Sequence, residues 1–273
     1  MRIRPGRQWW RHVLLAAGAI LVVVPFLWMF TTSLLSRAET YTNTSLLPVS
    51  WHWENYVRAW DAAPFGQYYL NSIIMSAGIV SGHLLLDGLA AYAFARLRFP
   101  LKNAIFVVLL AALLVPTFVT VIPAYSLVAS FHWIDSYAGL IVPRLADVFG
   151  IILLRQYFSS IPLELEEAAR IDGCSRAGVF FRIVVPLARP AFATLAIFSF
   201  LFAWNDFLWP LLVTNTDQFR TIQIGLSAFQ GRYGTSWNYL MAGTLTATVP
   251  SLIVFMIFQR ALVRGIATSG LKD

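Results

Sequence analysis

Residues Glu167 to Pro186 read E-A-A-R-I-D-G-C-S-R-A-G-V-F-F-R-I-V-V-P and separate two long apolar segments. The stretch is polar, favours helix and is punctuated by glycine, whereas the chain around it has a composition suited to lipid. A lipid environment gives no reason for such an element. A soluble partner held against the membrane face does give a reason, so we expect the stretch to form a docking element at the membrane surface.

The composition of the whole chain excludes a water-soluble globule. Its 273 residues are 58% hydrophobic and 12% charged, whereas soluble domains contain about 25% charged residues. The single cysteine, Cys174, excludes an internal disulfide and a metal site built from several cysteines. The net charge of +7 comes from basic residues dispersed among apolar segments rather than gathered on one face, so we expect no nucleic-acid partner.

Six apolar segments approach the length of about 20 residues that a helix needs to cross the hydrocarbon core. They are Val13–Leu34, Leu70–Phe94, Ala104–Ile122, Tyr137–Phe158, Ala191–Leu212 and Tyr239–Gln259. Pro116 and Pro123 predict a kink or an end in or after the third. Arg144 and Asp147 in the fourth are expected to neutralise each other. The sequence predicts an all-α integral membrane protein with six transmembrane helices, the first an uncleaved anchor.

The loops between these segments carry unequal numbers of basic residues. One side holds Arg2, Arg4, Arg7, Arg11, Arg96, Arg98, Lys102, Arg155, Arg170, Arg176, Arg182, Arg189, Arg260, Arg264 and Lys272. The other side holds Arg37, Arg58, Arg220 and Arg232, with Arg144 near it. Because the side with the excess of basic residues is the cytoplasmic one, we expect both chain termini and residues 167–186 to be cytoplasmic.

Local signals within the polar stretch predict two short helices joined by a turn. Pro162 suits the first turn of a helix, and Glu166 and Glu167 then lie near the positive end of its dipole. Gly173 is the left-handed residue that ends this helix, and Ser175 caps the next. The alternative is an ordinary amphipathic surface helix, which does not explain the spacing of the residues that follow.

That spacing resembles the cytoplasmic coupling loop of the permeases of ABC importers. In that loop E-A-A is followed by three residues and Gly, then by nine residues and Ile, then by one residue and Leu-Pro. The resemblance assigns the ATPase-coupling residues of this chain as Glu166, Glu167, Ala168, Ala169, Asp172, Gly173, Ile183 and Pro186. One position departs from the pattern, because Val185 stands where the family usually has Leu.

A wider similarity extends from about Tyr69 to the C-terminus. Residues 204–210 read W-N-D-F-L-W-P and resemble the fifth-span motif of carbohydrate-import permeases, and residues 220–235 and the tail from Gln259 continue the likeness. The chain thus resembles the maltose-type sugar permeases, in particular the shorter, six-span member of the usual pair. The resemblance implies the type I ABC importer permease fold, a multi-pass location in a bacterial or archaeal cell membrane, and import of a sugar or a related polyol.

The resemblance also implies several partners. They are a second homologous permease subunit, two ATP-binding subunits that hold ATP and Mg²⁺, and an extracytoplasmic solute-binding protein. The chain is then a transport subunit and no enzyme, and it binds no cofactor or metal itself. Its own lysines, Lys102 and Lys272, are not preceded by the glycine-rich sequence that cradles nucleotide phosphates.

This reading divides the chain into three parts. Residues 1–69 comprise the N-terminal cytoplasmic segment, the first transmembrane helix and an external loop. Residues 70–262 form the transmembrane core, which contains the coupling loop at residues 159–189. Residues 263–273 form a cytoplasmic tail.

Polar residues inside the apolar segments are candidates for contact with the solute. Trp204, Asn205 and Asp206 lie in the fifth segment, and a polar group there faces protein or water because exposing it to lipid is costly. They line the translocation pathway and bind sugar hydroxyls, or form contacts between helices, or lie near the outer interface where water reaches them. His83 and Asp87 share one face of the second segment, and we expect a buried structural pair there rather than a metal or proton site.

Two functions of other classes remain as alternatives. An intramembrane enzyme would use Asp87 and Asp206 as a paired acid and base, although no motif for a nucleophile accompanies them. A stand-alone channel or carrier would use the same carboxylates, but it would not need residues 167–186, and the six segments show no doubling that suggests inverted repeats.

Overall fold

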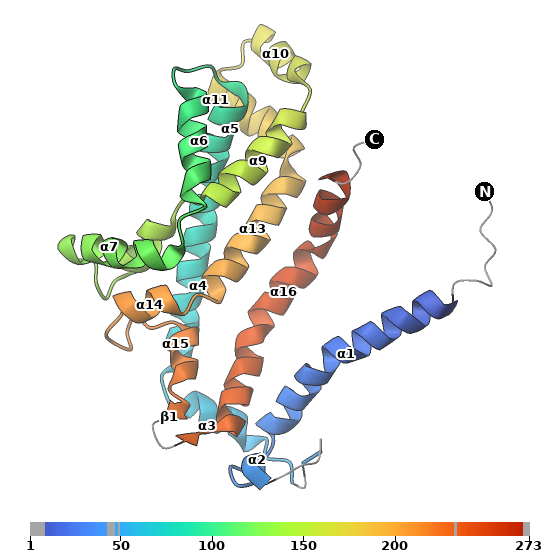
Figure 1. The fold of residues 1–273 in the computed structure, drawn as a ribbon, viewed down its shortest axis with the longest axis vertical. Coiled ribbons are helices and arrows are strands. Elements are labelled where there is room, and N and C mark those ends of the chain that lie inside the picture. The colour runs from blue at the N-terminus through green and yellow to red at the C-terminus, as the bar shows by residue number, and fades with distance from the viewer. Residues whose placement is uncertain (1–8, 43–46, 49, 232–233, 270–273) are drawn as a thin grey trace. The chain divides into compact units, whose positions relative to one another are not determined.

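The computed structural model describes residues 9–42, 47–48, 50–231 and 234–269, and the chain is mostly helical (Figure 1). The elements are α1 (Trp9–Ser33), α2 (Glu39–Thr42), α3 (Glu54–Asp61), α4 (Phe65–Gly82), the π-helix η2 (His83–Asp87), α5 (Gly88–Arg96), α6 (Lys102–Ala112), α7 (Thr117–Ser130), α8 (Tyr137–Ile141), the 3₁₀ turn η3 (Val142–Arg144), α9 (Val148–Ser160), α10 (Leu163–Ile171), α11 (Arg176–Val179), the π-helix η4 (Phe180–Val184), α12 (Val185–Leu187), α13 (Arg189–Trp204), α14 (Leu208–Val213), α15 (Ile222–Ser227), the two-residue strands β1 (Gln230–Gly231) and β2 (Gly234–Thr235), and α16 (Trp237–Ser269). Some sequence predictions concern residues outside the described ranges, namely Arg2, Arg4, Arg7, Arg232 and residues 270–273.

The chain forms two compact units. One contains Met1–Phe65 and Gly225–Val249, and the other contains Gly66–Ile224 and Pro250–Asp273. Residues 159–189 and residues 204–210 both belong to the second unit. The positions of the candidate functional residues relative to one another can therefore be described within the second unit.

The first unit is tied together by hydrogen bonds between segments distant in sequence. Asn55 on α3 is buried, and its side-chain amide donates to the carbonyls of Ser33 and Leu35, at 2.9 Å each. The Tyr41 hydroxyl donates to the Thr235 carbonyl at 2.6 Å. These bonds fasten the end of α1 to α3, and α2 to the antiparallel pair β1–β2.

The second unit is built around one long helix, because α4, η2 and α5 run on as a single rod that ends at Arg96. Its α5 and η2 portions pack against α9 and α13. The buried core there consists of Ala91, Tyr92, Phe94, Ile151, Leu154, Phe158, Ile161, Ala169, Val179, Phe180, Val184, Ala188, Ala191 and Leu195. Helix packing within a membrane depends on such van der Waals contact, because lipid tails are as apolar as the side chains.

Two glycines allow α8 and η3 to approach α4 closely. A Cβ atom at Gly82 would lie 2.6 Å from Leu145 Cδ2 and 2.7 Å from the Leu145 carbonyl oxygen. A Cβ atom at Gly78 would lie 2.9 Å from Ile141 Cδ1. Small residues four apart are a common means of close helix packing in membranes. The glycine face of α4 therefore fixes the position of the chain that leads into α9.

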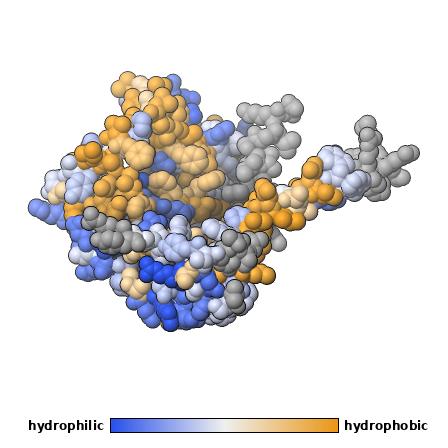
Figure 2. Space-filling view, turned by 60° about the horizontal axis from the view of Figure 1, so that its bottom comes forward, coloured by the Kyte–Doolittle hydropathy of each residue, from blue (hydrophilic) through white to orange (hydrophobic). Residues whose placement is uncertain are grey.

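Three helices in the described part of the chain are long and apolar enough to cross a membrane, namely Trp9–Ser33, Phe65–Arg96 and Trp237–Gln259. Three further pairs qualify only together: α6 with α7, bent by 102°, Tyr137–Arg144 with α9, bent by 43°, and Arg176–Leu187 with α13, bent by 80°. The candidate spans number three, or six if each bent pair is one span. Broad apolar areas lie beside a hydrophilic area on the face seen in Figure 2, and many large apolar side chains are exposed, as a lipid-facing protein requires.

The third, fourth and fifth predicted segments are each interrupted in the structure. The third breaks before Pro116, as the proline suggested, because proline disfavours helical geometry in the residue before it. The fourth breaks at Asp147, whose backbone is extended at the start of α9. The fifth stops at Trp204 and resumes at Leu208. Pro123 lies inside α7 without ending it.

Candidate functional site

The first helix of the polar stretch begins at an extended corner. α9 ends at Ser160, and both Ile161 and Pro162 have extended ψ angles, of 131° each. Pro162 is the residue before the helix rather than its first member, a difference of one position from the prediction. The chain therefore leaves helical geometry for two residues between α9 and α10.

The end of α10 is a Schellman turn centred on Gly173, whose φ is +86°. The Gly173 amide donates to the Arg170 carbonyl at 3.1 Å, and the Cys174 amide donates to the Ala169 carbonyl at 2.9 Å. No atom lies within 4 Å of the position that a Cβ would take at Gly173. Glycine is required here by the left-handed backbone rather than by space, so the sequence prediction for this residue is confirmed.

A second helical segment returns the chain to the core. Ser175 caps it, because its hydroxyl accepts from the Gly178 amide at 3.1 Å. Val179, Phe180 and Val184 are buried in the core of the second unit, and Ile183 packs against that core. Residues 162–187, which we call the coupling bracket, are therefore anchored at both ends.

The two faces of α10 have opposite character. Glu166 and Ala169 are buried, at 4% and 9% exposure. On the outer face Leu165 is 46% and Ile171 86% exposed. The predicted coupling residues Glu167, Ala168, Asp172 and Gly173 are exposed as well, whereas Ile183 and Pro186 are half-buried. An apolar and acidic outer face on a rigid bracket suits a protein partner.

Glu166 faces inward and is held by ionic and polar contacts. Its Oε1 accepts from Arg96 Nε at 2.6 Å, and its Oε2 accepts from the Tyr92 hydroxyl at 3.2 Å. Arg96 Nη2 also donates to the Ile161 carbonyl at 2.5 Å. The predicted group of coupling residues is thus divided, with Glu166 inside and Glu167 outside.

Asn205 and Asp206 lie at the break between α13 and α14. Asp206 Oδ2 pairs with Arg144 Nη2 at 3.1 Å, and Asp206 Oδ1 accepts from the Trp209 amide at 3.3 Å. The Arg144 guanidinium also lies 5.2 Å from the centre of the Phe202 ring. The expected pairing of Arg144 with Asp147 is therefore wrong, because the bend at η3 directs Arg144 toward the other broken helix.

Trp204 and Asn205 differ sharply in exposure. The Trp204 side chain is 1% exposed and stacks on Phe200, with ring centres 5.5 Å apart. Tyr69 contacts it edge-on at 5.5 Å. Asn205 is exposed and its side-chain amide donates to the Leu201 carbonyl at 2.8 Å. Asn205 is therefore accessible in this conformation and Trp204 is packed within the protein.

His83 and Asp87 are both buried on η2, but the expected contact between them is wrong. His83 Nδ1 lies 2.7 Å from Ser199 Oγ, and its Nε2 lies 2.9 Å from the Arg144 carbonyl. Asp87 Oδ1 accepts from the Asp147 amide at 3.0 Å, at the start of α9. Each side chain therefore links the long helix to the fourth segment by a separate contact.

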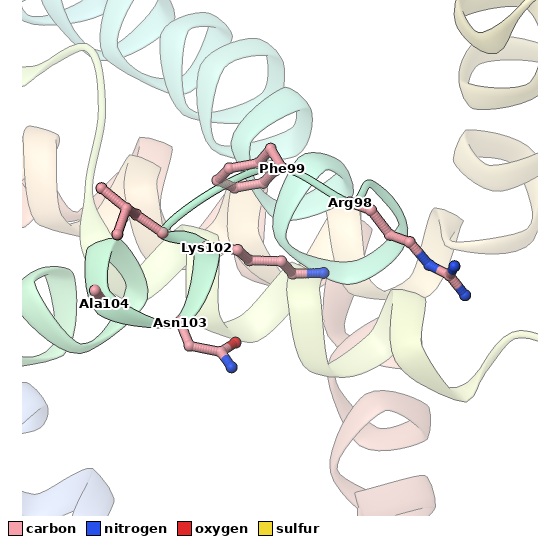
Figure 3. Close-up of a pocket in the computed structure, with 6 residues that line it drawn as sticks. Arg98, Phe99, Lys102, Asn103 and Ala104 are labelled. Carbon is pink, nitrogen blue, oxygen red and sulfur yellow. The ribbon is translucent and has the colours of Figure 1, made fainter.

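A surface hollow of about 360 Å³ lies in the turn between α5 and α6 (Figure 3). It is lined by Arg98, Phe99, Leu101, Lys102, Asn103 and Ala104. Lys102 Nζ donates to the Leu97 carbonyl at 2.9 Å, so this ammonium group closes the turn. None of the residues that line this hollow belongs to the coupling bracket.

Apolar helices of this kind, long enough to cross a membrane singly or as bent pairs, are typical of an integral membrane protein. Residues 87–268 match the family of inner-membrane components of binding-protein-dependent transport systems. The chain therefore belongs to that family, and the resemblance to ABC permeases drawn from the sequence is confirmed.

Full-length relatives agree with this assignment. The chain is 35% identical to the sn-glycerol-3-phosphate transport system permease protein UgpE of Pectobacterium atrosepticum, over 97% of this chain and 98% of that protein. It is 35% identical to the probable ABC transporter permease protein YurM of Bacillus subtilis, over 98% and 92%. A chain of a bacterial ABC transporter involved in import of the acidic polysaccharide alginate has a similar fold, with a TM-score of 0.82 at 22% identity over 95% of this chain and 99% of that one.

Sequence reasoning missed the partners of the charged residues. Arg96 was counted only as a cytoplasmic charge, and Tyr92 was assigned no role. The available signal was their spacing of four, which places both residues on one face if the helix of the second segment continues to Arg96. That spacing does not name Glu166 as their common partner.

Proposed function

We propose that this chain is the permease subunit of an ATP-driven ABC importer and forms part of the transmembrane pathway for a sugar or a related polyol. ATP and Mg²⁺ bind to a separate subunit, and this chain binds no cofactor. The observation that carries the proposal is the exposed outer face of α10, held on a bracket anchored in the core at both ends. Such a face serves a protein partner and has no use in lipid.

The bracket transmits force because it is short and closed by defined turns. The Schellman turn at Gly173 and the cap at Ser175 fix the angle between α10 and α11. A cleft in the ATP-binding subunit grips Glu167 and its exposed neighbours. When two such subunits close on ATP, the bracket moves as a rigid body and shifts the population between inward-open and outward-open states.

Three kinds of partner follow from this mechanism. They are a second homologous permease, a pair of ATP-binding subunits and an extracytoplasmic solute-binding protein. The description of the family as binding-protein-dependent supports the last of these. So does a structure with a TM-score of 0.63 and 16% identity over 92% of this chain and 93% of that one, described as an alginate ABC transporter in complex with a periplasmic protein bound to an alginate pentasaccharide.

The nature of the solute is inferred from relatives. A relative of this chain over nearly its whole length belongs to a transport system for sn-glycerol-3-phosphate, a phosphorylated polyol. Asn205 is exposed at the break between α13 and α14 and can offer hydrogen bonds to hydroxyl groups there. We place Asn205 and Asp206 on the pathway, and Trp204 behind them as support.

The topology proposed from loop charges belongs to the same mechanism. Both termini and the coupling bracket lie on the cytoplasmic side, where ATP-binding subunits are found. Residues 70–262 form the transmembrane core, with the coupling loop at 159–189. Residues 1–69 precede that core, and residues 263–273 form a cytoplasmic tail.

The test is Glu167→Lys in the complete importer. The exposed charge is reversed, so we expect the permease to insert normally, to lose the ATP-binding subunits on purification, and to transport no solute. The matched control is Asp61→Lys, the same kind of charge reversal at an exposed residue of α3. Normal uptake by the Glu167→Lys importer would refute the proposed function.

A further inference from the structure

We propose that Arg96 and Glu166 form a buried brace that fixes the coupling helix to the long second-span helix, and that this brace sets how much solute is moved for each ATP. The inference rests on the proposed function and adds a positioning role for three residues. The brace comprises Tyr92, Arg96 and Glu166, together with the Ile161 carbonyl that Arg96 binds.

The two-residue link from α9 does not by itself fix the angle of α10. Only Ile161 and Pro162 join α9 to α10, and both are extended rather than helical. Proline restricts its own φ and the conformation of the residue before it, but the ψ angle of Pro162 still governs the direction of α10. A contact between α10 and a neighbouring helix constrains that direction at this end of the helix, as the turn at Gly173 does at the other end.

Arg96 supplies this contact to two elements at once. One edge of its guanidinium binds Glu166 on α10, and another nitrogen binds the carbonyl of Ile161 at the corner. The guanidinium is planar and its donors have fixed directions, so two acceptors on two elements define one relative orientation. Tyr92, one turn earlier on α5, binds the second carboxylate oxygen and prevents rotation of Glu166.

Because this pair is buried, removal of either side chain is costly. The side chains of Arg96 and Glu166 are 11% and 5% exposed. A buried ion pair is weak evidence for added stability, but removal of one partner leaves an uncompensated charge. An apolar contact at this position would hold α10 close to α5 without fixing its direction. The charged contact therefore fixes the direction of α10 relative to α5.

The brace gives the bracket a third mechanical connection to the core, in addition to its two covalent ones. The covalent chain connects the bracket to α9 at one end and to α13 at the other. Through Arg96 it also connects to the end of α5, and hence to the whole rod of α4, η2 and α5. When the ATP-binding subunit displaces α10, this rod moves with it. Without the brace α10 still docks through Glu167 and its neighbours, but part of its movement is lost at the non-helical corner of Ile161 and Pro162.

The experiment compares ATP use with solute uptake in proteoliposomes that contain the complete importer. We test Glu166→Gln, which removes the charge at nearly constant size. We also test Arg96→Lys, which keeps the charge but loses the planar guanidinium that binds Glu166 and the Ile161 carbonyl together. Both complexes should assemble and hydrolyse ATP, while the solute imported per ATP falls at least about fivefold, the lower range of coupling between distant sites. Arg98→Met, at an exposed arginine two residues further on, should leave the ratio unchanged.

The outcomes separate the brace from the proposed function. An unchanged ratio of solute to ATP in both brace variants overturns the brace. Failure of both variants to accumulate as folded protein overturns it too, because the pair is then a folding element only. If Glu167→Lys abolishes assembly while the brace variants transport normally, the proposed function stands without the brace. If Glu167→Lys transports normally, the proposed function itself fails.

Discussion

The coupling bracket and the polar break of the second unit are both interruptions of an apolar chain, yet they are held in different ways. The turn of the bracket from α10 to α11 is shaped by short-range contacts, such as the bond from Cys174 to Ala169 and the cap by Ser175. The break at Asn205 and Asp206 is held by Arg144, which lies about sixty residues earlier in the chain. Contacts between residues close in sequence therefore suffice for a surface turn, whereas a break inside a membrane core depends on a partner that is distant in sequence.

The largest expected effect breaks the long-range contact. Arg144→Met leaves Asp206 without its cationic partner in a site where both side chains are less than one-fifth exposed. Loss of one member of such a pair should cost about 3 kcal/mol or more, measured as the change in free energy of unfolding in detergent. The double variant Arg144→Met with Asp206→Asn should be more stable than Arg144→Met alone. If the double variant is the least stable, the pair does not hold the break.

The second prediction breaks the bracket at its turn. Gly173→Val should cost about 1–2 kcal/mol because an L-residue is strained at a φ of +86°, and transport should fall because the angle of α10 changes. The measurements are the midpoint of thermal unfolding and the uptake rate. Gly173→Asn should be milder, since Asn tolerates the left-handed region better. Gly66→Ala serves as a control, because no atom lies within 4 Å of its Cβ position and its φ is not positive.

A smaller effect is expected at the cap of the second helix. Ser175→Ala removes the bond to the Gly178 amide and should cost about 1 kcal/mol, with a modest fall in transport. Amide hydrogen exchange at Gly178 reports the loss directly. Ser159→Ala is the matched control, because its hydroxyl bonds only to the Arg155 carbonyl inside a helix. Equal effects of the two variants would show that the cap does not shape the bracket.

The smallest effect is expected at Asp135, whose contact joins two loops distant in sequence but is exposed rather than buried. Asp135 accepts from Thr216 Oγ1 at 2.7 Å and from the amides of Asn215 and Thr216. Burial acts to raise the pKa of Asp135, but these hydrogen bonds together outweigh it and hold the pKa below 3.8.

The sign of the resulting pH dependence follows from that direction. Because the pKa is lower in the folded protein, the contact stabilises the fold fully above about pH 4 and is lost as the pH falls through the folded pKa. Unfolding measured between pH 5 and pH 2.5 should show this loss in the native protein and less of it in Asp135→Asn. Asn suits the site because the φ of residue 135 is +58°. An identical pH profile in both proteins would contradict the assignment.

The sequence located the bracket well because its signals are local. Gly173 and Ser175 were assigned their turn and cap from residue type alone, and the structure confirms both. The apolar segments were also found, since length and hydropathy are local properties. The family followed from the fixed spacing of the E-A-A stretch and is confirmed.

The sequence could not give the partners of the charged residues. Arg144 was paired with Asp147, which lies three positions away, whereas the bend at η3 turns it toward Asp206. Glu166 and Glu167 are adjacent in sequence, and no local rule states which of them faces the core. Burial of one and exposure of the other depend on Arg96, seventy residues earlier. Long-range charge pairing was therefore the part that had to come from the structure.

The apolar ridge on the outer face of α10 has a consequence for how such a subunit must be produced. Leu165 and Ile171 are exposed in this chain, and under the proposed function they stay exposed until an ATP-binding subunit covers them. Exposed apolar side chains of this kind promote aggregation and attract quality-control proteases. An orphan copy made in excess should therefore be short-lived in the cell. Balanced synthesis of the subunits then becomes a requirement set by one helix, independent of the solute carried.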